Sequence, residues 1–134
     1  MDINELSALE LSAAIRAGEI GVREATTDAL ERAHADRLGA FTHLCDERAL
    51  RQADELQAWL ADEGFTPGPL FGVPCPIKDL TQVKGLPLEG GSVTLRGNIA
   101  TRDDGVVQRL RDAGTVMIGK TSTPEFGLPC YTEP

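Results

Sequence analysis

Small and apolar residues recur three and four positions apart through the first 64 residues and predict helices separated by short turns. The first helix is expected over residues 7–17, with Ser7 as its N-cap. Ser7 and Glu10 have the spacing of a capping box, in which each side chain accepts a hydrogen bond from the other residue's backbone N–H. A second helix is expected over residues 22–36. The predicted buried stripes are Leu11, Ala14 and Ile15 in the first helix and Val22, Ala25, Ala29 and Ala33 in the second.

A short alternating strand over residues 41–45 comes next, and a third helix is expected over residues 46–63 with Asp46 as its N-cap. Strand and helix patterns then alternate. They comprise a strand over 71–80, a helix from 103 or 104 to about 113, and a strand over 115–119. The order helix–helix–strand–helix–strand–helix–strand is typical of an α/β layer with parallel strands.

Composition divides the chain at about residue 64. Residues 1–64 contain 14 acidic residues, 6 arginines and no proline, so they account for the whole formal charge of −8. Residues 65–134 contain 7 acidic and 7 basic residues, all 8 prolines and 10 of the 14 glycines. We interpret the first region as an acidic helical layer on the outside of an α/β core that begins in the second region.

The overall charge and the cysteine pattern exclude several classes of protein. Nucleic-acid-binding surfaces cluster Lys and Arg, which this acidic chain does not. No apolar run approaches the ~20 residues that span a bilayer, and the N-terminus lacks the basic and then apolar order of a signal peptide. Cys45, Cys75 and Cys130 have irregular spacing, which indicates neither a disulfide framework nor a metal site. We therefore predict a cytoplasmic protein.

Lys78 is the main candidate for chemistry because of its predicted place on a strand. Side chains alternate along a strand, so Lys78 shares a face with Pro74 and Pro76, opposite Ile77. The prolines lack N–H groups on one edge only, which leaves the other edge able to pair. Lys78 then ends the strand, where open α/β sheets build their sites, and partial burial there would favour a neutral amine that can act as a base. The alternative is an ordinary surface lysine beside Asp79.

Other polar residues have structural interpretations. Ser12 is expected on a helix surface, and Ser92 lies in a glycine-rich loop that lacks the GxSxG pattern of a nucleophile. Lys120 follows a strand but lacks the glycine five residues earlier that a phosphate loop requires. Cys75 and Cys130 are expected to be small buried hydrophobes rather than reactive thiols.

Two blocks of sequence resemble the amidase signature family, in the order that the family shows. The first block is Pro69-Leu70-Phe71-Gly72-Val73-Pro74, then Ile77-Lys78-Asp79, Gly85-Leu86-Pro87 and Gly91-Ser92. The second block is Asp104-Gly105-Val106-Val107, then Ala113-Gly114, Ile118-Gly119-Lys120-Thr121 and Pro124-Glu125-Phe126. With the acidic helical start, the resemblance covers nearly the whole chain.

The resemblance implies the amidase signature fold, in which N-terminal helices pack on the first strands of a mixed, largely parallel sheet. It also implies a serine hydrolase that cleaves carboxylic amide C–N bonds through a Ser–Ser–Lys triad, with no metal and no cofactor. Lys78 takes the position of the lysine base. Ser92 and Ser122 belong to the two quoted blocks and not to the Gly/Ser-rich signature that carries both triad serines. We therefore expect residues 1–134 to be the N-terminal part of one amidase domain, inactive alone.

Two alternatives to an ordinary amidase remain open. One is a non-catalytic interaction module, with the acidic helices as a docking surface, for example in a homodimer. The other is the A-type subunit of a glutamine-dependent amidotransferase, which shares the lysine block. An ordinary amidase acting on a small-molecule amide is preferred because no sequence feature suggests a tRNA-handling partner. Neither nucleic acid nor a membrane is expected as a partner.

The strands of the second half predict marginal stability for the isolated chain. Both are apolar on both faces, as in a parallel sheet covered by helices on each side. The sequence plainly offers only one helical layer, and unpaired strand edges favour aggregation. Strong protection of residues 71–80 against hydrogen exchange would contradict this expectation.

Overall fold

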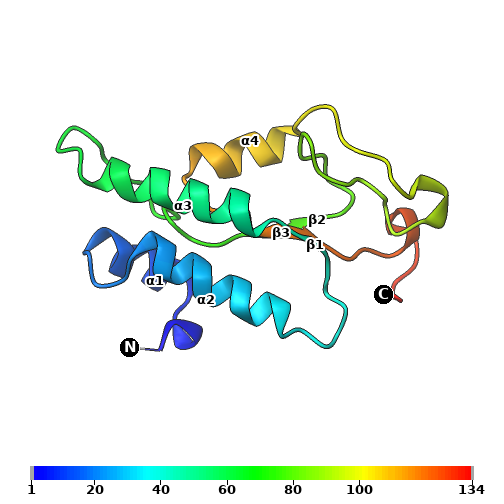
Figure 1. The fold of residues 1–134 in the computed structure, drawn as a ribbon, viewed down its shortest axis with the longest axis horizontal. Coiled ribbons are helices and arrows are strands. Elements are labelled where there is room, and N and C mark those ends of the chain that lie inside the picture. The colour runs from blue at the N-terminus through cyan, green and yellow to red at the C-terminus, as the bar shows by residue number, and fades with distance from the viewer. Residues whose placement is uncertain (1, 134) are drawn as a thin grey trace.

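The computed structural model describes residues 2–133 and shows helices packed around a small sheet (Figure 1). None of the helices in that range is long and apolar enough to cross a membrane. In chain order, the elements are η1 (Ile3–Glu5), α1 (Ala8–Arg16), α2 (Val22–His34), β1 (Phe41–Leu44), α3 (Asp46–Leu60), β2 (Ile77–Lys78), η2 (Val93–Leu95), α4 (Gly105–Asp112), β3 (Gly119–Thr121) and η3 (Glu125–Gly127).

The capping box predicted at the start of α1 is confirmed. Ser7 Oγ accepts a hydrogen bond from the backbone N–H of Glu10 at 3.3 Å, and Glu10 Oε2 accepts one from Ser7 N–H at 2.8 Å. The cap predicted for α3 is wrong, because Asp46 is the first helical residue and Cys45 is the N-cap. The Asp46 carboxylate instead lies 2.7 Å from Nε2 of His34, which joins the start of α3 to the end of α2.

Helices α2 and α3 end two and three residues earlier than predicted, and in each case an aspartate stabilises the turn that follows. The Asp36 carboxylate accepts hydrogen bonds from the N–H groups of Leu38 and Ala40, at 3.2 and 2.7 Å. Asp62 Oδ1 accepts one from Gly64 N–H at 2.9 Å. Side chains that bond nearby backbone groups compete with the helix, and here they end it.

The sheet has the strand order β1-β3-β2 and is mixed, as the fold class predicts. Strand β2 runs parallel to β3, whereas β1 runs antiparallel to it. The strand predicted over 71–80 is much shorter than expected, since only Ile77–Lys78 and an isolated bridge between Pro74 and Val116 pair with the next segment. The strand predicted over 115–119 is displaced to Gly119–Thr121.

We call residues 74–79, which contain both prolines and β2, the proline segment. The prediction that one edge of this segment can still pair is confirmed. The N–H of Cys75 donates to the carbonyl of Val116 at 2.7 Å, and the N–H of Asp79 donates to the carbonyl of Thr121 at 2.9 Å. Backbone groups alternate between edges along an extended chain, so Pro74 and Pro76 present their nitrogens to the other edge. The two prolines therefore leave the bonds to the β3 segment intact.

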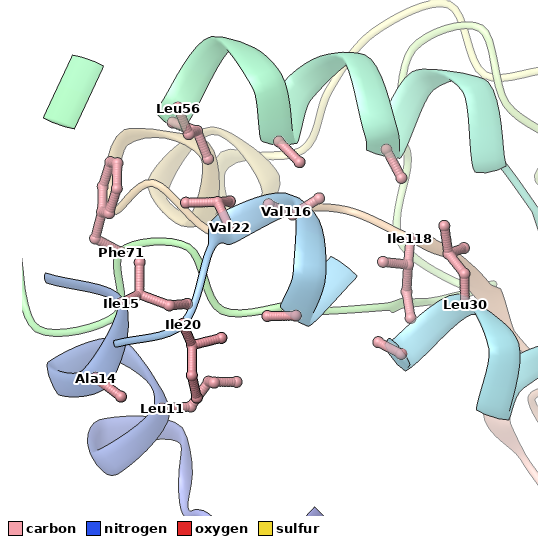
Figure 2. Close-up of a cluster of buried hydrophobic side chains, with 14 residues drawn as sticks. Leu11, Ala14, Ile15, Ile20, Val22, Leu30, Leu56, Phe71, Val116 and Ile118 are labelled. Atoms are coloured by element: carbon pink, nitrogen blue, oxygen red, sulfur yellow. The ribbon is translucent and has the colours of Figure 1, made fainter. Parts of the chain in front are cut away.

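Helices lie on both faces of the sheet, which corrects the expectation of a single helical layer. On one face, α1 and α2 pack on Val116 and Ile118 in the main hydrophobic cluster (Figure 2). On the other face, Val107 and Leu110 of α4 pack with Ile77. Helix α3 supplies Ala49, Ala53 and Leu56 to the main cluster.

Helix α3 is tied to the segment before β3 by the amide group of Gln52. Its Nε2 donates to the carbonyl of Thr115 at 3.0 Å, and its Oε1 accepts from the N–H of Met117 at 3.1 Å. The Gln52 side chain thus bonds the backbone edge as a neighbouring strand would. This contact fixes α3 beside the segment that leads into β3.

Candidate active site

Lys78 is the last residue of β2, the position that the sequence predicts. Its side chain is exposed, and no hydrogen bond or ion pair of its amine is found among residues 2–133. The partial burial expected beside the prolines is absent because the adjacent residues, Pro76 and Leu80, are exposed as well. The structure therefore places a solvent-facing amine at the end of a parallel strand.

Asp79, the next residue, turns away from solvent and pairs with a different lysine. Its carboxylate Oδ1 lies 3.2 Å from Nζ of Lys120, and the two side chains are 2% and 0% exposed. The N–H of Glu89 also donates to this carboxylate, at 3.3 Å to each oxygen. Sequence reasoning considered Asp79 only as a neighbour of Lys78, and the structure assigns it to Lys120 instead. We call Asp79 and Lys120 the buried pair.

The ammonium of Lys120 has acceptors for all three of its N–H donors. Besides Asp79, it donates to the carbonyl of Thr81 at 2.8 Å and to the carbonyl of Pro87 at 3.1 Å. A lysine ammonium has three donors and no acceptor, so this one is fully satisfied. Sequence reasoning considered Lys120 only as a phosphate-loop residue and did not predict its burial. The available signal was its place directly after a buried strand, since alternation turns one of two successive side chains inward.

The glycine-rich loop after β2 folds back onto the C-terminal segment, as the right-hand end of Figure 1 shows. The carbonyl of Asp79 accepts a hydrogen bond from Gly90 N–H at 3.1 Å, and the carbonyl of Gly90 accepts one from Phe126 N–H at 2.8 Å. Gly91 has φ +68°, and a Cβ built there would lie 2.5 Å from the carbonyl oxygen of Thr123. Only glycine fits where the loop passes the backbone of Thr123. The loop and residues 123–126 are therefore held together close to Asp79.

Ser92 has the structural role that the sequence predicts. Its side chain is buried, donates to Oε1 of Glu125 at 2.8 Å and lies 2.8 Å from the hydroxyl of Thr94. The hydroxyl thus joins the two family-like blocks rather than facing Lys78 as a nucleophile. Ser12 differs from its expected place on a helix surface, because it is fully buried and donates to the carbonyl of Phe71 at 2.9 Å.

The start of α4 is joined to the loop that follows β2 by two aspartates. Of the two residues at which this helix was predicted to begin, Asp104 is the N-cap of α4, and its carboxylate accepts from Gln82 N–H at 2.8 Å. Asp103 accepts from Lys84 N–H at 2.8 Å and from Arg111 at 2.6 Å. The hydrogen bond from Arg111 and that from Lys84 N–H hold the pKa of Asp103 below its ordinary value, against an opposing effect of desolvation.

A cavity of about 270 Å³ lies between α3 and α4, on the face of the proline segment that carries Cys75 and Ile77. Lys78 does not line it, so the cavity is separate from the candidate base. Burial raises the pKa of the Cys75 thiol. Cys75 is half-buried and Cys130 is exposed, so neither is the fully buried hydrophobe that was expected. No group of three or more His, Cys, Asp or Glu side chains that could hold a metal ion is found within residues 2–133.

Family membership follows from a match that covers most of the chain. The profile of the Amidase family matches residues 24–134. The chain belongs to the amidase signature family. The chain is 42% identical, over 134 residues, to the A-type subunit of the glutamyl-tRNA(Gln) amidotransferase of Salinispora arenicola (strain CNS-205), covering 98% of the chain and 27% of that protein. It is 38% identical over 128 residues to an acylamidase of Rhodococcus erythropolis, covering 94% of the chain and 27% of that protein.

Solved structures confirm the fold. The native peptide amidase of Stenotrophomonas maltophilia superposes with a TM-score of 0.79 and 33% sequence identity, over 91% of this chain and 26% of that one. The chain therefore spans about a quarter of the length of the relatives that it matches. Within residues 2–133, the four α-helices and the mixed sheet correspond to one part of the larger amidase fold.

Proposed function

We propose that this chain supplies the lysine base of an amide hydrolase and that Lys78 is that base. The position of Lys78 supports the proposal: it ends the parallel strand β2, and its amine is exposed and without a partner among residues 2–133. The other two lysines are less suitable. All three donors of Lys120 are occupied, and Lys84 lies beyond the strand in the following loop.

In the proposed reaction, a bridging serine relays a proton from the nucleophilic serine to the neutral amine of Lys78. The nucleophile adds to the amide carbonyl, and the C–N bond breaks as the proton returns through the bridging serine to the leaving nitrogen. Water then hydrolyses the acyl-enzyme. Both serines come from sequence outside residues 1–134, so we propose that these residues are the N-terminal part of one amidase domain. A base without its nucleophile forms no acyl-enzyme, and the chain alone is inactive.

Chimeric enzymes test this proposal. Residues 1–134 replace the matched region of the Rhodococcus acylamidase, and release of an aryl amine from an acyl anilide is measured. We expect no release by the chain alone, release by the chimera, and loss of release in the chimera with Lys78→Ala. Lys84→Ala is the matched control because it removes a nearby exposed lysine and is expected to keep activity. A second chimera, with the Stenotrophomonas peptide amidase, provides an independent junction. Undiminished turnover in Lys78→Ala chimeras that fold would overturn the proposal.

A second candidate function is that of an A-type subunit in a glutamine-dependent amidotransferase. The 42% identity to the A-type subunit of the Salinispora glutamyl-tRNA(Gln) amidotransferase favours it, since that exceeds the 38% identity to the acylamidase. The two functions share amide hydrolysis and differ in the substrate that supplies the amide. A chimera with the remaining part of the Salinispora protein distinguishes the two functions. It is assayed for glutamine hydrolysis together with the other subunits of that amidotransferase. Glutamine hydrolysis that depends on Lys78 would support this candidate.

A further inference from the structure

We infer that the buried pair, Asp79 and Lys120, positions Lys78 for catalysis, an inference that rests on the proposed function. The side chains of both residues are almost completely buried, whereas that of Lys78 is exposed. They act through the backbone that they hold on either side of the strand end. They are therefore positioning residues and not catalytic ones.

The first step of the argument is the backbone on either side of Lys78. Strand β2 is only two residues long, so the ladder alone gives its end little support. Asp79 is bonded at every polar group. Its N–H donates to the Thr121 carbonyl, its carbonyl accepts from Gly90 N–H, and its carboxylate binds Lys120 and Glu89 N–H. The residue that follows the base is thus fixed in three directions.

The second step is the loop that leaves the strand. Lys120 binds the carbonyls of Thr81 and Pro87, which lie near the two ends of the loop that follows Asp79. The Lys120 ammonium therefore holds both ends of this loop against strand β3. In that strand, Lys120 is the parallel register partner of Ile77. The contacts cross-link the strand before Lys78 to the loop after it.

The third step is the charge of the pair. A buried ammonium without a counter-charge is strongly unfavourable, and Asp79 supplies that charge at 3.2 Å. Replacing a buried ion pair by apolar residues of similar volume can leave the stability of a protein unchanged. The distinct contribution of the polar pair is therefore its specific hydrogen bonds, which an apolar pair lacks. We assign those bonds to holding the Lys78 amine in register with the serine that it deprotonates.

The active acylamidase chimera tests this inference with Lys120→Met, Asp79→Asn and the double variant Asp79→Leu/Lys120→Met. We expect kcat, expressed per active site by burst titration, to fall on the order of 100-fold in Lys120→Met with KM unchanged, since small misplacements of a reacting group have such effects. The double variant recovers urea stability but not kcat. Lys84→Met is the control, because Lys84 is exposed and no hydrogen bond or ion pair joins its side chain to the pair within residues 2–133.

Hydrogen exchange of the 134-residue chain provides a readout that loss of stability alone does not reproduce. In Lys120→Met, we expect faster exchange at the amides of Asp79 and Gly90 while the amide of Cys75, upstream in the same segment, keeps its rate. Equal acceleration at all three amides would overturn the inference, as would a normal kcat per active site in a folded double variant. If Lys78→Ala retains full activity, the proposed function fails. If Lys78→Ala is inactive and the double variant has normal kcat, only the positioning inference fails.

Discussion

Gly114 lies against the ring of Phe71 with no room for a side chain. A Cβ built on Gly114 would be 2.6 Å from Cδ2 of Phe71, and the glycine has φ +79°. Its carbonyl also accepts a hydrogen bond from Gly72 N–H at 2.8 Å. The turn that ends α4 thus packs against the segment that leads into the proline strand, in the wall of the main hydrophobic cluster.

Gly114→Ala is expected to destabilise the chain more than Gly18→Ala. Gly18 has a similar φ of +76° and nothing within 4 Å of its built Cβ, so both variants carry the left-handed strain of about 1–2 kcal/mol. Only the Gly114 variant adds a clash with Phe71, and overpacking costs about 1–3 kcal/mol more. Urea unfolding followed by circular dichroism measures both. Equal losses in the two variants would show that Phe71 can move aside.

Ser12→Ala is expected to lower the free energy of unfolding by about 1–3 kcal/mol. Ser12 Oγ donates to the Phe71 carbonyl, for which no other hydrogen bond is found among residues 2–133, and the variant leaves that acceptor unsatisfied. Thr26→Val is the matched control: Thr26 is equally buried and bonds the Val22 carbonyl within its own helix, which the helix already satisfies. A loss in Thr26→Val as large as in Ser12→Ala would contradict this explanation.

The local part of the fold could be predicted from spacing and caps, whereas parts that depend on distant partners could not. The Ser7–Glu10 capping box follows from residues three apart, and the structure confirms it. The limits of the strands depend on pairing of the proline segment with a segment some 40 residues later, which local pattern does not encode. Ser12 had a usable signal: it lies three residues before Ile15, which puts both on the same face of α1.

In the candidate site, too, features set by local sequence could be predicted, and features set by distant partners could not. The position of Lys78 at a strand end follows from alternation and the prolines, and the structure bears it out. The pairing of Asp79 with Lys120 joins residues 41 positions apart, so no local pattern identifies it. The exposure of the Lys78 side chain could not be predicted either, because it depends on what packs over the strand end.

Asp103 is expected to contribute to stability only above acidic pH. Its folded pKa is lowered from 3.8 mainly by the hydrogen bond from Arg111, so its contribution is present above pH 3.8 and is lost as pH falls through the folded pKa. Arg111 is 39% exposed, which limits the contribution to about 1 kcal/mol or less. The difference in urea midpoint between the unmodified chain and Asp103→Asn is expected to be constant near neutral pH and to shrink below pH 3.8. Glu63→Gln, on the exposed surface, is the control, and a difference that does not change with pH would refute the assignment.

The three cysteines are expected to react with iodoacetamide at different rates, with Cys130 first. Thiolate is the reactive form, and burial raises the pKa of Cys45 and of Cys75, whereas Cys130 is exposed. Cys45 is further restrained by its Sγ contact with the carbonyl of Met117 at 3.5 Å. A time course at mildly alkaline pH, read by peptide mass spectrometry, measures the three rates in one sample. In concentrated urea, the rates are expected to converge, because unfolding removes the burial that separates them. Native labelling of Cys75 as fast as Cys130 would show that the face of the proline segment next to α3 and α4 opens readily, contrary to the packing that holds Lys78 at its end.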